Sequence, residues 1–358
     1  MTCTVLTPTR LGAVELSNRL VMAPLTRLRC GEQGIPDDVV VEYYRQRAST
    51  GMIVTEGTWP VPEGRSWIGQ PGIATEEQAA GWARVAEAVH AAGGRIAMQV
   101  MHGGRLSHPE ITGSGRVVSA SATTGPDPAR TPDGKVVAPT AHALTEDEIQ
   151  QVIQGFVDGA RRAIEAGMDA VELHGANGYL IHQFLAPSTN LRDDGWGGSP
   201  ARRARFAIEV TRAVARAIGA DRTGIRLSPE NSIQGIDETD AEAVRETYAT
   251  WAAAVAPLGL AFVDVLHHDP ASFLVQEIRR ISGAPLMVNT GFDAPSTREV
   301  LEGFLERESA DAVAVGRPLI ANPDLLRRWR EGLPENEADA STFYEGGERG
   351  YTDYPFVG

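Results

Sequence analysis

The sequence predicts a closed (β/α)₈ barrel. Eight short apolar runs recur along the 358 residues, and a stretch with helical spacing of apolar residues separates nearly every neighbouring pair. Repeated units of a strand and a helix are typical of a closed parallel barrel. An open, doubly wound sheet is the structural alternative. However, the chain lacks the Gly-rich motifs G-x-G-x-x-G and G-x-x-x-x-G-K-[ST] in a strand–turn–helix context.

The eight apolar runs give the expected strands. They lie at residues 19–25, 51–56, 95–101, 170–173, 224–228, 261–266, 285–289 and 312–316. Ahead of them, residues 5–19 alternate polar and apolar around a turn at 10–12, which predicts a hairpin that caps one end of the fold. Residues 37–48 have the first helical spacing.

Start signals mark several helices between these strands. Three of them are capping boxes, in which a threonine hydroxyl and the side chain three residues later each accept a hydrogen bond from a free backbone amide at the start of a helix. The three boxes predict helices that end at about residues 92, 166 and 257. These boxes begin at Thr75, Thr145 and Thr239. Ser199-Pro200 and Asn322-Pro323 carry the other signal, an N-cap followed by proline.

The whole chain, residues 1–358, is expected to form a single barrel domain with one long insertion. Residues 103–144 lie between the third strand and its helix and are dense in Gly, Pro, Ser and Thr. Because so long a loop in a compact domain is usually functional, we expect it to cover the mouth of the barrel rather than to be a mobile excursion. The tail, 343–358, is rich in Tyr, Phe and Gly and is expected to fold over the mouth as well.

Composition excludes several classes of partner. The formal net charge of −14 argues against nucleic acid and anionic membrane surfaces, which both attract basic patches. Only two cysteines are present, so no disulfide framework or multi-cysteine metal site can be built, and a reducing cytoplasm is expected. The N-terminus lacks a basic region followed by an apolar core, so no secretory signal is expected.

Polar side chains cluster just after the fourth strand. The run 170–173 ends in His174, and Asn177 and Tyr179 follow it within six positions, with glycines between them. The carboxyl ends of barrel strands are where chemistry occurs. A lone histidine here would more simply be a satisfied core residue and Tyr179 a packing aromatic, but three convergent polar groups favour a functional site.

Other strand ends indicate an anionic ligand. Gly291, Gly316 and Arg317 follow the seventh and eighth strands, where barrels often bind phosphate, although glycines there can be turn residues alone. Arg226 puts a guanidinium inside an apolar strand, where an unpaired charge is costly. Its partner is either an inward-facing acid or an electron-rich ligand such as a flavin, whose reduced ring a fixed cation would stabilise. Gln99 could pair with the same ring edge.

These residues together resemble the Old Yellow Enzyme family of FMN-dependent ene-reductases. The matching stretches include LSNRLVMAPLTRLR (16–29), MQVMHGGR (98–105), VELHGANGYLIHQFLAPSTN (171–190), VAVGRPLIANPDL (313–325) and FYEGGERGYTDYPF (343–356), in family order over nearly the whole chain. The resemblance is to the main branch of the family, with threonine in APLTR and a His/Asn pair after the fourth strand.

The resemblance implies roles for individual residues. The residues that would bind FMN are Pro24, Leu25, Thr26, Gly57, Gln99, Arg226, Asn289, Gly291, Gly316 and Arg317. His174 and Asn177 would bind the carbonyl oxygen of the substrate, and Tyr179 would donate a proton. Those expected to line the substrate pocket as well are Trp67, Met101 and Tyr351. Met101 stands where the family often has tryptophan, so the pocket shape should differ.

The resemblance also implies an activity. FMN, bound tightly but non-covalently, would take electrons from NAD(P)H and pass hydride from its N5 atom to an α,β-unsaturated carbonyl compound, and to nitroalkenes. Hydride transfer would leave negative charge on the substrate oxygen, which His174 and Asn177 would stabilise. The protein would be a cytoplasmic monomer or homodimer, with small molecules as its only partners and no metal.

Three other functions are alternatives. A larger flavoprotein with an iron–sulfur cluster needs a set of cysteines that the chain lacks. A metal-dependent hydrolase could use side chains at several strand ends, but Arg226 would repel a cation. Its candidate ligands are His102, His174, His267, His268 and Asp264. A sensory barrel without catalysis is the third, and the intact His174, Asn177 and Tyr179 argue against it.

Overall fold

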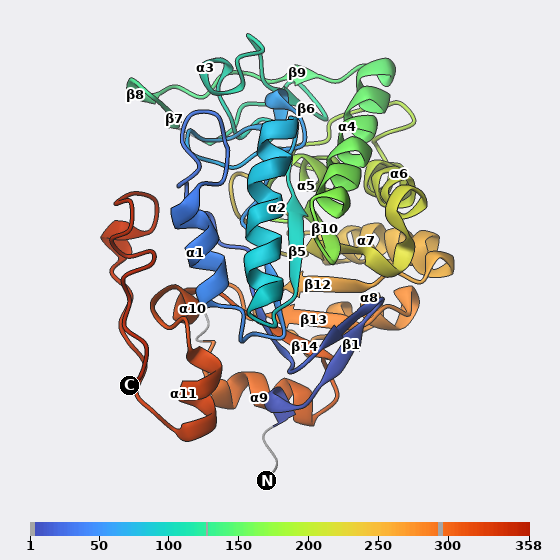
Figure 1. Cartoon of the computed structure of the whole chain (residues 1–358). Coiled ribbons are helices and arrows are strands. Elements are labelled where there is room, and N and C mark those ends of the chain that lie inside the picture. Colours follow the sequence, from blue (N-terminus) through green and yellow to red (C-terminus); the bar gives the residue numbers. More distant parts are fainter. Residues whose placement is uncertain (1–3, 127, 293–295) are drawn as a thin grey trace.

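The computed structural model describes residues 4–126, 128–292 and 296–358. It confirms the closed barrel: the described parallel strands pair in the order β10-β11-β12-β13-β14-β3-β4-β5, and β10 closes the ring by pairing with β5 (Figure 1). The barrel strands are β3 (Leu20–Met22), β4 (Met52–Val54), β5 (Ile96–Val100), β10 (Ala170–Gly175), β11 (Thr223–Leu227), β12 (Phe262–Leu266), β13 (Leu286–Asn289) and β14 (Ala312–Val315).

One strand is longer than the sequence predicted. β10 continues through His174 and Gly175, because these residues still pair with Arg226 and Leu227 of β11. His174 is therefore part of the barrel wall and not of the loop that follows it. This places the histidine ring on a rigid strand, next to the strand that carries Arg226.

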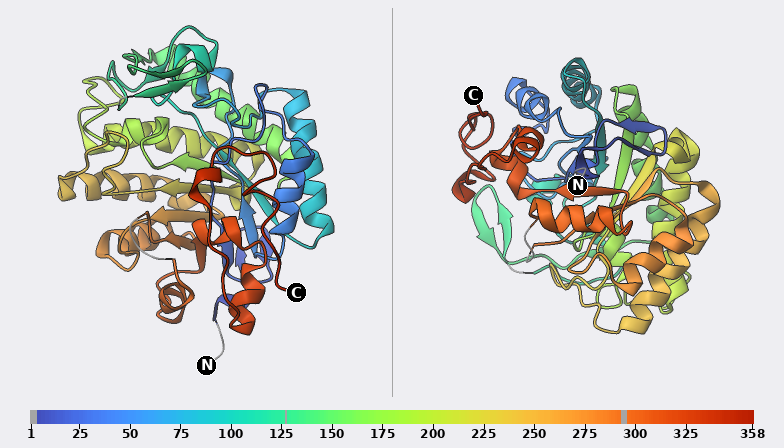
Figure 2. Two further views of the ribbon diagram at one scale, coloured as in Figure 1. Left: turned by 90° about the vertical axis from the view of Figure 1, so that its left-hand side faces the viewer. Right: turned by 90° about the horizontal axis from the view of Figure 1, so that it is seen from below.

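Helices surround the barrel, as the two views in Figure 2 show. The longer helices are α1 (Asp38–Gln46), α2 (Glu76–Ala91), α4 (Glu146–Glu165), α6 (Pro200–Ile218), α7 (Ala241–Val255), α8 (Phe273–Ser282) and α9 (Arg298–Glu306). Shorter ones are α3 (Pro109–Thr112), α5 (Leu180–Leu185), α10 (Arg317–Ala321) and α11 (Leu325–Glu331). Single 3₁₀ turns are η1 (Thr4–Leu6), η2 (Pro62–Gly64), η3 (Ala220–Arg222), η4 (Ala256–Leu258) and η5 (Ala340–Thr342).

The predicted capping boxes at Thr75 and Thr145 are confirmed, and so is the N-cap at Ser199 with proline after it. Two other start signals were wrong by one or two residues. Helix α7 is capped by Asp240, whose carboxylate accepts a hydrogen bond from the amide of Ala243 at 3.1 Å.

The second correction concerns the start of α11. Its N-cap is Asp324 and not Asn322. The side chain of Asn322 is already used, because it donates to the carbonyl of Pro318 at 2.8 Å and accepts from the amide of Asn336 at 2.6 Å. A sequence signal for a cap cannot show that the side chain has a closer partner elsewhere in the fold.

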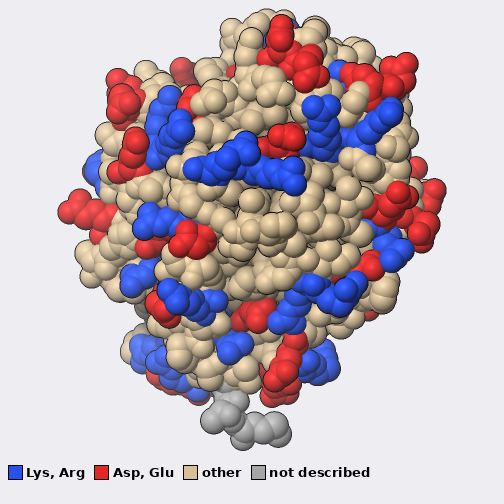
Figure 3. Space-filling view, turned by 90° about the vertical axis from the view of Figure 1, so that its right-hand side faces the viewer, with Lys and Arg blue, Asp and Glu red and all other residues tan. Residues whose placement is uncertain are grey.

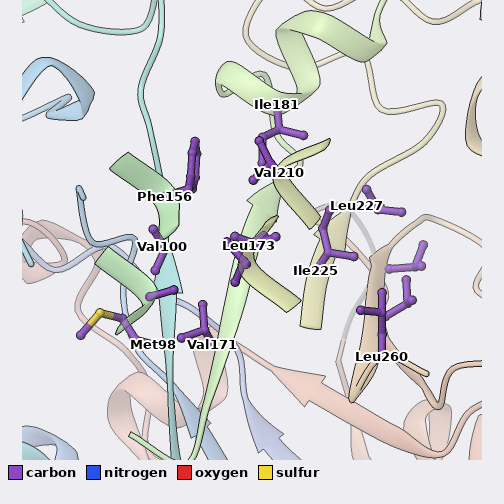
Figure 4. Packing of buried hydrophobic residues seen from close by; sticks show 14 of the residues in the cluster. Met98, Val100, Phe156, Val171, Leu173, Ile181, Val210, Ile225, Leu227 and Leu260 are labelled. Atoms are coloured by element: carbon purple, nitrogen blue, oxygen red, sulfur yellow. The ribbon is translucent and has the colours of Figure 1, made fainter. Parts of the chain in front are cut away.

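The core has two layers on opposite sides of the barrel wall. The larger lies between strands and helices, where Val100, Leu173 and Ile225 meet Phe156 and Val210 (Figure 4). The smaller cluster groups apolar residues of the strands with those of the N-terminal hairpin, β1 (Thr9–Leu11) and β2 (Val14–Leu16). The predicted hairpin is thus confirmed. It leaves the other, carboxyl end of the barrel for a ligand.

Gly12 makes the hairpin turn with φ 57, and an added Cβ there would lie 2.2 Å from the carbonyl oxygen of Asp221. The turn therefore needs glycine both for its backbone conformation and for its close approach to the barrel.

The long insertion contains short strands of its own. β6 (Val118–Ser119) pairs with β9 (His142–Ala143), and β7 (Ala129–Thr131) forms a hairpin with β8 (Gly134–Val136). Figure 1 shows these elements together at the top of the view.

On the face drawn in Figure 3, acidic and basic side chains are interspersed, so the net charge of −14 is not gathered there into one patch. Within the described part of the chain, every helix is too short or too polar to cross a membrane.

Candidate active site

A cavity of about 1010 Å³ lies at the carboxyl ends of the strands. It brings together nearly all the site residues that the sequence predicted, from the first strand end to the last. Those that line it are Pro24, Leu25, Thr26, Trp67, Gln99, Met101, His174, Asn177, Tyr179, Arg226, Asn289, Gly291, Gly316 and Arg317. The size is at the upper end for ligand sites, and it leaves room for a cofactor and a second molecule.

His174, Asn177 and Tyr179 lie on one side of this cavity. The rings of His174 and Tyr179 are 4.8 Å apart between centroids, and Trp67 meets Tyr179 edge-on at 6.0 Å. His174 is only 5 % exposed and Tyr179 only 7 %. The Nδ1 atom of His174 and the Oδ1 atom of Asn177 have no hydrogen-bond partner among the described residues. Buried polar atoms without partners, next to a cavity, fit a polar ligand.

Burial sets the protonation of both rings. It lowers the pKa of His174 well below its usual value, and the nearby Arg226 lowers it further. The imidazole is therefore neutral at neutral pH and has one N–H to donate. Burial also raises the pKa of Tyr179 well above its usual value, although a hydrogen bond from Gln234 opposes this. The phenol thus keeps its proton and can act as an acid.

Arg226 lines the cavity, and it also has an acidic partner. Its Nη1 atom donates to Oδ2 of Asp264 at 2.6 Å, and the register of β11 and β12 places the two residues side by side. The two possibilities left open by the sequence, an inward-facing acid and a ligand, are therefore compatible. The Nε atom of Arg226 has no partner within the described ranges, so one donor is left for a bound molecule.

A second carboxyl group lies beside this ion pair. Glu172 accepts a hydrogen bond from Nε2 of Gln99 at 2.8 Å and is fully buried. Burial raises the pKa of Glu172 to about 8, and the charge of Asp264 adds to the effect. Burial also raises the pKa of Asp264, against the effect of Arg226. The pKa values of both acids beside the Arg226 guanidinium are therefore raised, so each carboxyl group holds a proton more readily than in water.

Sequence reasoning missed Glu172 and named Asp264 only as a possible metal ligand. The signal was available in the alternation of the strands. Glu172 is two residues before His174 on the same strand, so both side chains point to the same side of the barrel wall. A charged residue at such a position needs a polar partner inside the barrel.

The ends of β13 and β14 and the segments that follow them supply to the lining of the cavity Asn289, Gly291, Gly316 and Arg317. The side chain of Asn289 donates to the carbonyl of Ala314 at 2.7 Å and accepts from the amide of Gly291 at 3.0 Å. It therefore ties β13 to β14 and shapes the loop. Arg317 is bonded only weakly, by Nη1 to the carbonyl of Phe292 at 3.4 Å, and can turn toward an anion.

Two predicted residues do not line the cavity. Gly57 lies behind the wall, since an added Cβ would be 2.6 Å from the sulfur of Met101 and 3.4 Å from Oε1 of Gln99. It leaves space for two side chains that do reach the cavity. Tyr351 is fully buried elsewhere and stacks on Tyr43, with ring centroids 4.0 Å apart.

The tail reaches the cavity through other aromatic residues than the one expected. Phe343 and Tyr344, from the same FYEGG stretch, line the wall in place of Tyr351. Two further residues that sequence reasoning did not name are Gln234, from the loop after β11, and Arg130, from β7 of the insertion. Both lie in connections between barrel elements, whose path over the barrel has no periodic signal in the sequence.

The candidate metal ligands do not gather. Asp264 is bonded to Arg226, and Nε2 of His267 lies 3.1 Å from Oε2 of Glu230. In the portion of the chain that the structure describes, no three His, Cys, Asp or Glu side chains are placed to hold a metal ion. The hydrolase alternative therefore lacks a ligand set there.

The chain is similar to a known family and to known proteins over most of its length. Residues 4–336 match the model of the NADH:flavin oxidoreductase / NADH oxidase family. The chain is 40 % identical to a chanoclavine-I aldehyde reductase of Penicillium roqueforti, over 98 % of this chain and 95 % of that protein. It is 39 % identical to a probable flavin mononucleotide-dependent alkene reductase of Leishmania infantum, over 98 % and 97 % of the two chains.

Solved structures are similar over the full length. The Old Yellow Enzyme homologue of Zymomonas mobilis superposes with a TM-score of 0.93 at 38 % identity, covering 99 % of this chain and 100 % of the other. Morphinone reductase in complex with tetrahydroNAD gives a TM-score of 0.91 at 40 % identity, covering 99 % and 98 %.

Proposed function

The chain belongs to the NADH:flavin oxidoreductase / NADH oxidase family, and we propose that it reduces the carbon–carbon double bond of α,β-unsaturated carbonyl compounds, and of nitroalkenes. It is an oxidoreductase of the Old Yellow Enzyme type, with FMN as its cofactor and NAD(P)H as its electron donor. The chemistry that FMN supplies when bound is hydride transfer, first from NAD(P)H and then to the β-carbon of the substrate. The specific substrate, the residue roles and the assignment to a His/Asn branch are part of the proposal.

The cavity suits FMN because hydrogen-bond donors from several strand ends line it. Gln99 on β5 and Arg226 on β11, the two strands that flank β10, would hold the polar edge of the ring, with Thr26 at another edge. The free Nε of Arg226 supports this placement. Residues that would bind the rest of the cofactor are Pro24, Leu25, Asn289, Gly291, Gly316 and Arg317. Among them, Arg317 would supply the charge-assisted contact to the phosphate.

His174 and Asn177 would bind the oxygen of the substrate. When the β-carbon accepts hydride, negative charge develops on that oxygen, and fixed donors stabilise it. His174 is neutral, so it would donate one N–H, and the amide of Asn177 would donate a second. Removing one donor of this type typically lowers the rate by about 10²–10³.

Tyr179 would supply the proton for the α-carbon. Its ring packs between His174 and Trp67, close to the oxygen-binding pair, and its raised pKa keeps the phenol protonated. Positioned acid catalysis typically contributes about 10²–10⁴ in rate. Gln234 would orient the hydroxyl group through its hydrogen bond.

Trp67, Met101 and Tyr344 would define the substrate pocket. Met101 is a flexible thioether and adapts to substrates of different shape. The insertion, 103–144, would cover part of the mouth, which the position of Arg130 supports. A cytoplasmic location and a monomeric or dimeric state are further expectations from the sequence.

The observation that carries the proposal is the neutral His174 beside Asn177, Tyr179 and a cavity-facing Arg226. The test uses the purified protein reconstituted with FMN, and follows the flavin absorbance in each half of the reaction separately. Tyr179→Phe should slow reoxidation by cyclohexenone by about 10²-fold while flavin reduction by NAD(P)H stays within about twofold of wild type.

Equal slowing of both halves would contradict the role of Tyr179. A protein that takes up no FMN would contradict the whole proposal. A protein that binds FMN but does not reduce cyclohexenone, a maleimide or a nitroalkene would instead favour the sensory barrel.

A further inference from the structure

The turn that carries Asn177 has an unusual backbone. Asn177 has φ 55, a left-handed conformation that few residues other than glycine adopt, and Gly178 follows with φ 81. Asparagine followed by glycine is a preferred pair where two successive residues have positive φ, so the local sequence favours this backbone and the surrounding contacts fix where the turn lies. The turn lies between His174 and Tyr179, so its shape decides where the amide of Asn177 points.

Side chains hold every backbone polar group of this turn. The amide of Asn177 donates to Oγ of Ser228 at 2.9 Å, and its carbonyl accepts from Nε2 of Gln234 at 2.9 Å. The amide of Gly178 donates to Nδ1 of His182 at 3.1 Å, and its carbonyl accepts from Nε2 of Gln183 at 2.7 Å. The turn is therefore held by four side chains in addition to its own backbone hydrogen bond, from the amide of Tyr179 to the carbonyl of Ala176 at 3.2 Å.

Among these side chains, Gln183 has an amide that is fully buried and that contacts four different residues. Its Nε2 atom donates to the carbonyls of Gly178 at 2.7 Å and of Gly103 at 3.1 Å. Its Oε1 atom accepts from the amide of Arg105 at 3.2 Å and from Oγ of Ser119 at 2.8 Å. An amide side chain has two donor hydrogens and two acceptor positions, so all four are occupied.

Three of these four partners belong to the insertion. Gly103 and Arg105 are at its start, and Ser119 is in β6. The approach is close, since a Cβ added to Gly104 would lie 2.2 Å from Oε1 of Gln183. Gln183 itself does not line the cavity, so it acts on the site only through the backbone it holds.

We propose that Gln183 is a positioning residue that fixes the Asn177–Gly178 turn to the base of the 103–144 insertion, so that the oxygen-binding pair keeps its geometry. This rests on the proposed function, because the turn matters only if His174 and Asn177 bind a substrate oxygen. The NH₂ group of Gln183 is the critical feature, because it donates to two carbonyl oxygens that only a donor can satisfy.

Gln183→Glu is the sharpest test. It keeps the size and both acceptor positions but replaces the NH₂ group with an oxygen that faces the carbonyls of Gly103 and Gly178. The turn should then shift. We use 4-nitrophenol as the probe, because its phenolate oxygen should bind the same donors and its absorbance reports ionisation. The variant should bind the probe about tenfold more weakly, and the pKa of the bound probe should rise toward that of the free probe.

The matched control is Gln78→Glu. Gln78 is also buried, accepts from the amides of Ala74 and Thr75, and donates to the carbonyl of Gln33, but it lies at the start of α2, outside the cavity lining. The same chemical change there should leave probe affinity and the pKa of the bound probe as in wild type. A general loss of packing would move both variants alike, and that result would overturn the proposal.

Ser119→Ala tests the link to the insertion and covers the case in which Gln183→Glu does not fold. It removes one hydrogen bond to Oε1 of Gln183 and should weaken probe binding about twofold to threefold. Unchanged probe binding in this variant would overturn the link.

FMN retention separates the two claims. If wild type holds FMN and binds the probe but Gln183→Glu behaves like wild type, the positioning role fails and the proposed function stands. If wild type binds neither, both fail.

Discussion

Two buried clusters of polar residues that include arginine differ in what the guanidinium groups contact. We define the barrel cluster as Gln99, Glu172, Arg226 and Asp264. We define the tail cluster as Arg27, Arg29, Arg47, Tyr43, Glu56 and Tyr351. The barrel cluster has two acids for one arginine, whereas the tail cluster has three arginines for one acid. Both are deep in the protein, so burial alone does not separate them.

In the tail cluster, backbone carbonyls occupy the arginine donors. Arg27 donates to the carbonyls of Phe343 at 2.9 Å and Gly350 at 2.6 Å. Arg47 donates to those of Leu319 and Ile320, each at 2.8 Å. The Arg47 guanidinium also lies 3.8 Å from the centre of the Tyr43 ring. These arginines tie the tail to the barrel and have a structural role.

In the barrel cluster, Arg226 makes one ion pair and keeps a donor that no described residue satisfies. It also lines the cavity, which no tail-cluster arginine does. A buried arginine therefore indicates a ligand when one of its donors remains unsatisfied beside a cavity. An arginine whose donors meet carbonyls holds the fold together instead.

The largest effect should come from removing one arginine from each cluster. Arg226→Met should weaken FMN binding about 10–100-fold, the worth of a hydrogen bond to a charged group. It should also destabilise the fold by about 3–5 kcal/mol, because buried acids lose their cation. Arg47→Met should lower thermal stability but leave FMN affinity within about threefold. FMN titration of the apoprotein and thermal unfolding measure both.

Equal loss of FMN affinity in the two variants would show that the tail-cluster arginine also serves the ligand, and the two clusters would then not differ in role. Unchanged FMN affinity in Arg226→Met would show that Arg226 does not serve the ligand, which also contradicts the proposed difference between the clusters.

The second effect is on the pH dependence of stability. The pKa of Glu172 is raised to about 8 from the usual 4.5, mainly by burial. The folded state therefore holds this proton more tightly than the unfolded state does. The stabilisation is complete below pH 4.5 and is lost as the pH rises to about 8. Glu172→Gln should lose less stability than wild type between pH 5 and pH 8 in urea unfolding.

Asp264, Arg226 and Gln99 face Glu172. These three residues are therefore left unchanged in both proteins when Glu172→Gln is compared with wild type. A wild-type stability that does not change over this range, or one that rises, would show that Glu172 is ionised throughout.

A smaller effect of the same sign is expected in the tail cluster. Burial raises the pKa of Glu56 to about 7, but two hydrogen bonds to its Oε2, from the amides of Arg27 and Leu28, partly offset this. The loss of stability should therefore end near pH 7 and be smaller than for Glu172. Glu56→Gln, compared with wild type at pH 5 and pH 7 by urea unfolding, should show this smaller difference. A steeper dependence than that of Glu172 would contradict the order.

The sequence predicted the barrel because periodicity and capping are local properties. It also predicted most cavity residues, because strand ends in a closed barrel converge by topology. It did not show that Asp264 partners Arg226, since this depends on the register between two strands. The sequence reasoning wrongly placed Tyr351 in the cavity wall. The path of the irregular tail follows from contacts with distant arginines and not from any local pattern, so the sequence could not show where Tyr351 lies.

The smallest effect should be that of Tyr351→Phe, and it tests this correction. The hydroxyl of Tyr351 is buried without a hydrogen-bond partner in the part of the chain described, so its removal should change stability by less than about 1 kcal/mol. The stacking on Tyr43 persists with phenylalanine, and KM for cyclohexenone should stay at the wild-type value. Tyr344→Ala should instead raise KM a few-fold, because Tyr344 lines the cavity and is 55 % exposed. If Tyr351→Phe raised KM more than Tyr344→Ala, the tail cluster would contribute to the site directly, and the division between the two clusters would no longer hold.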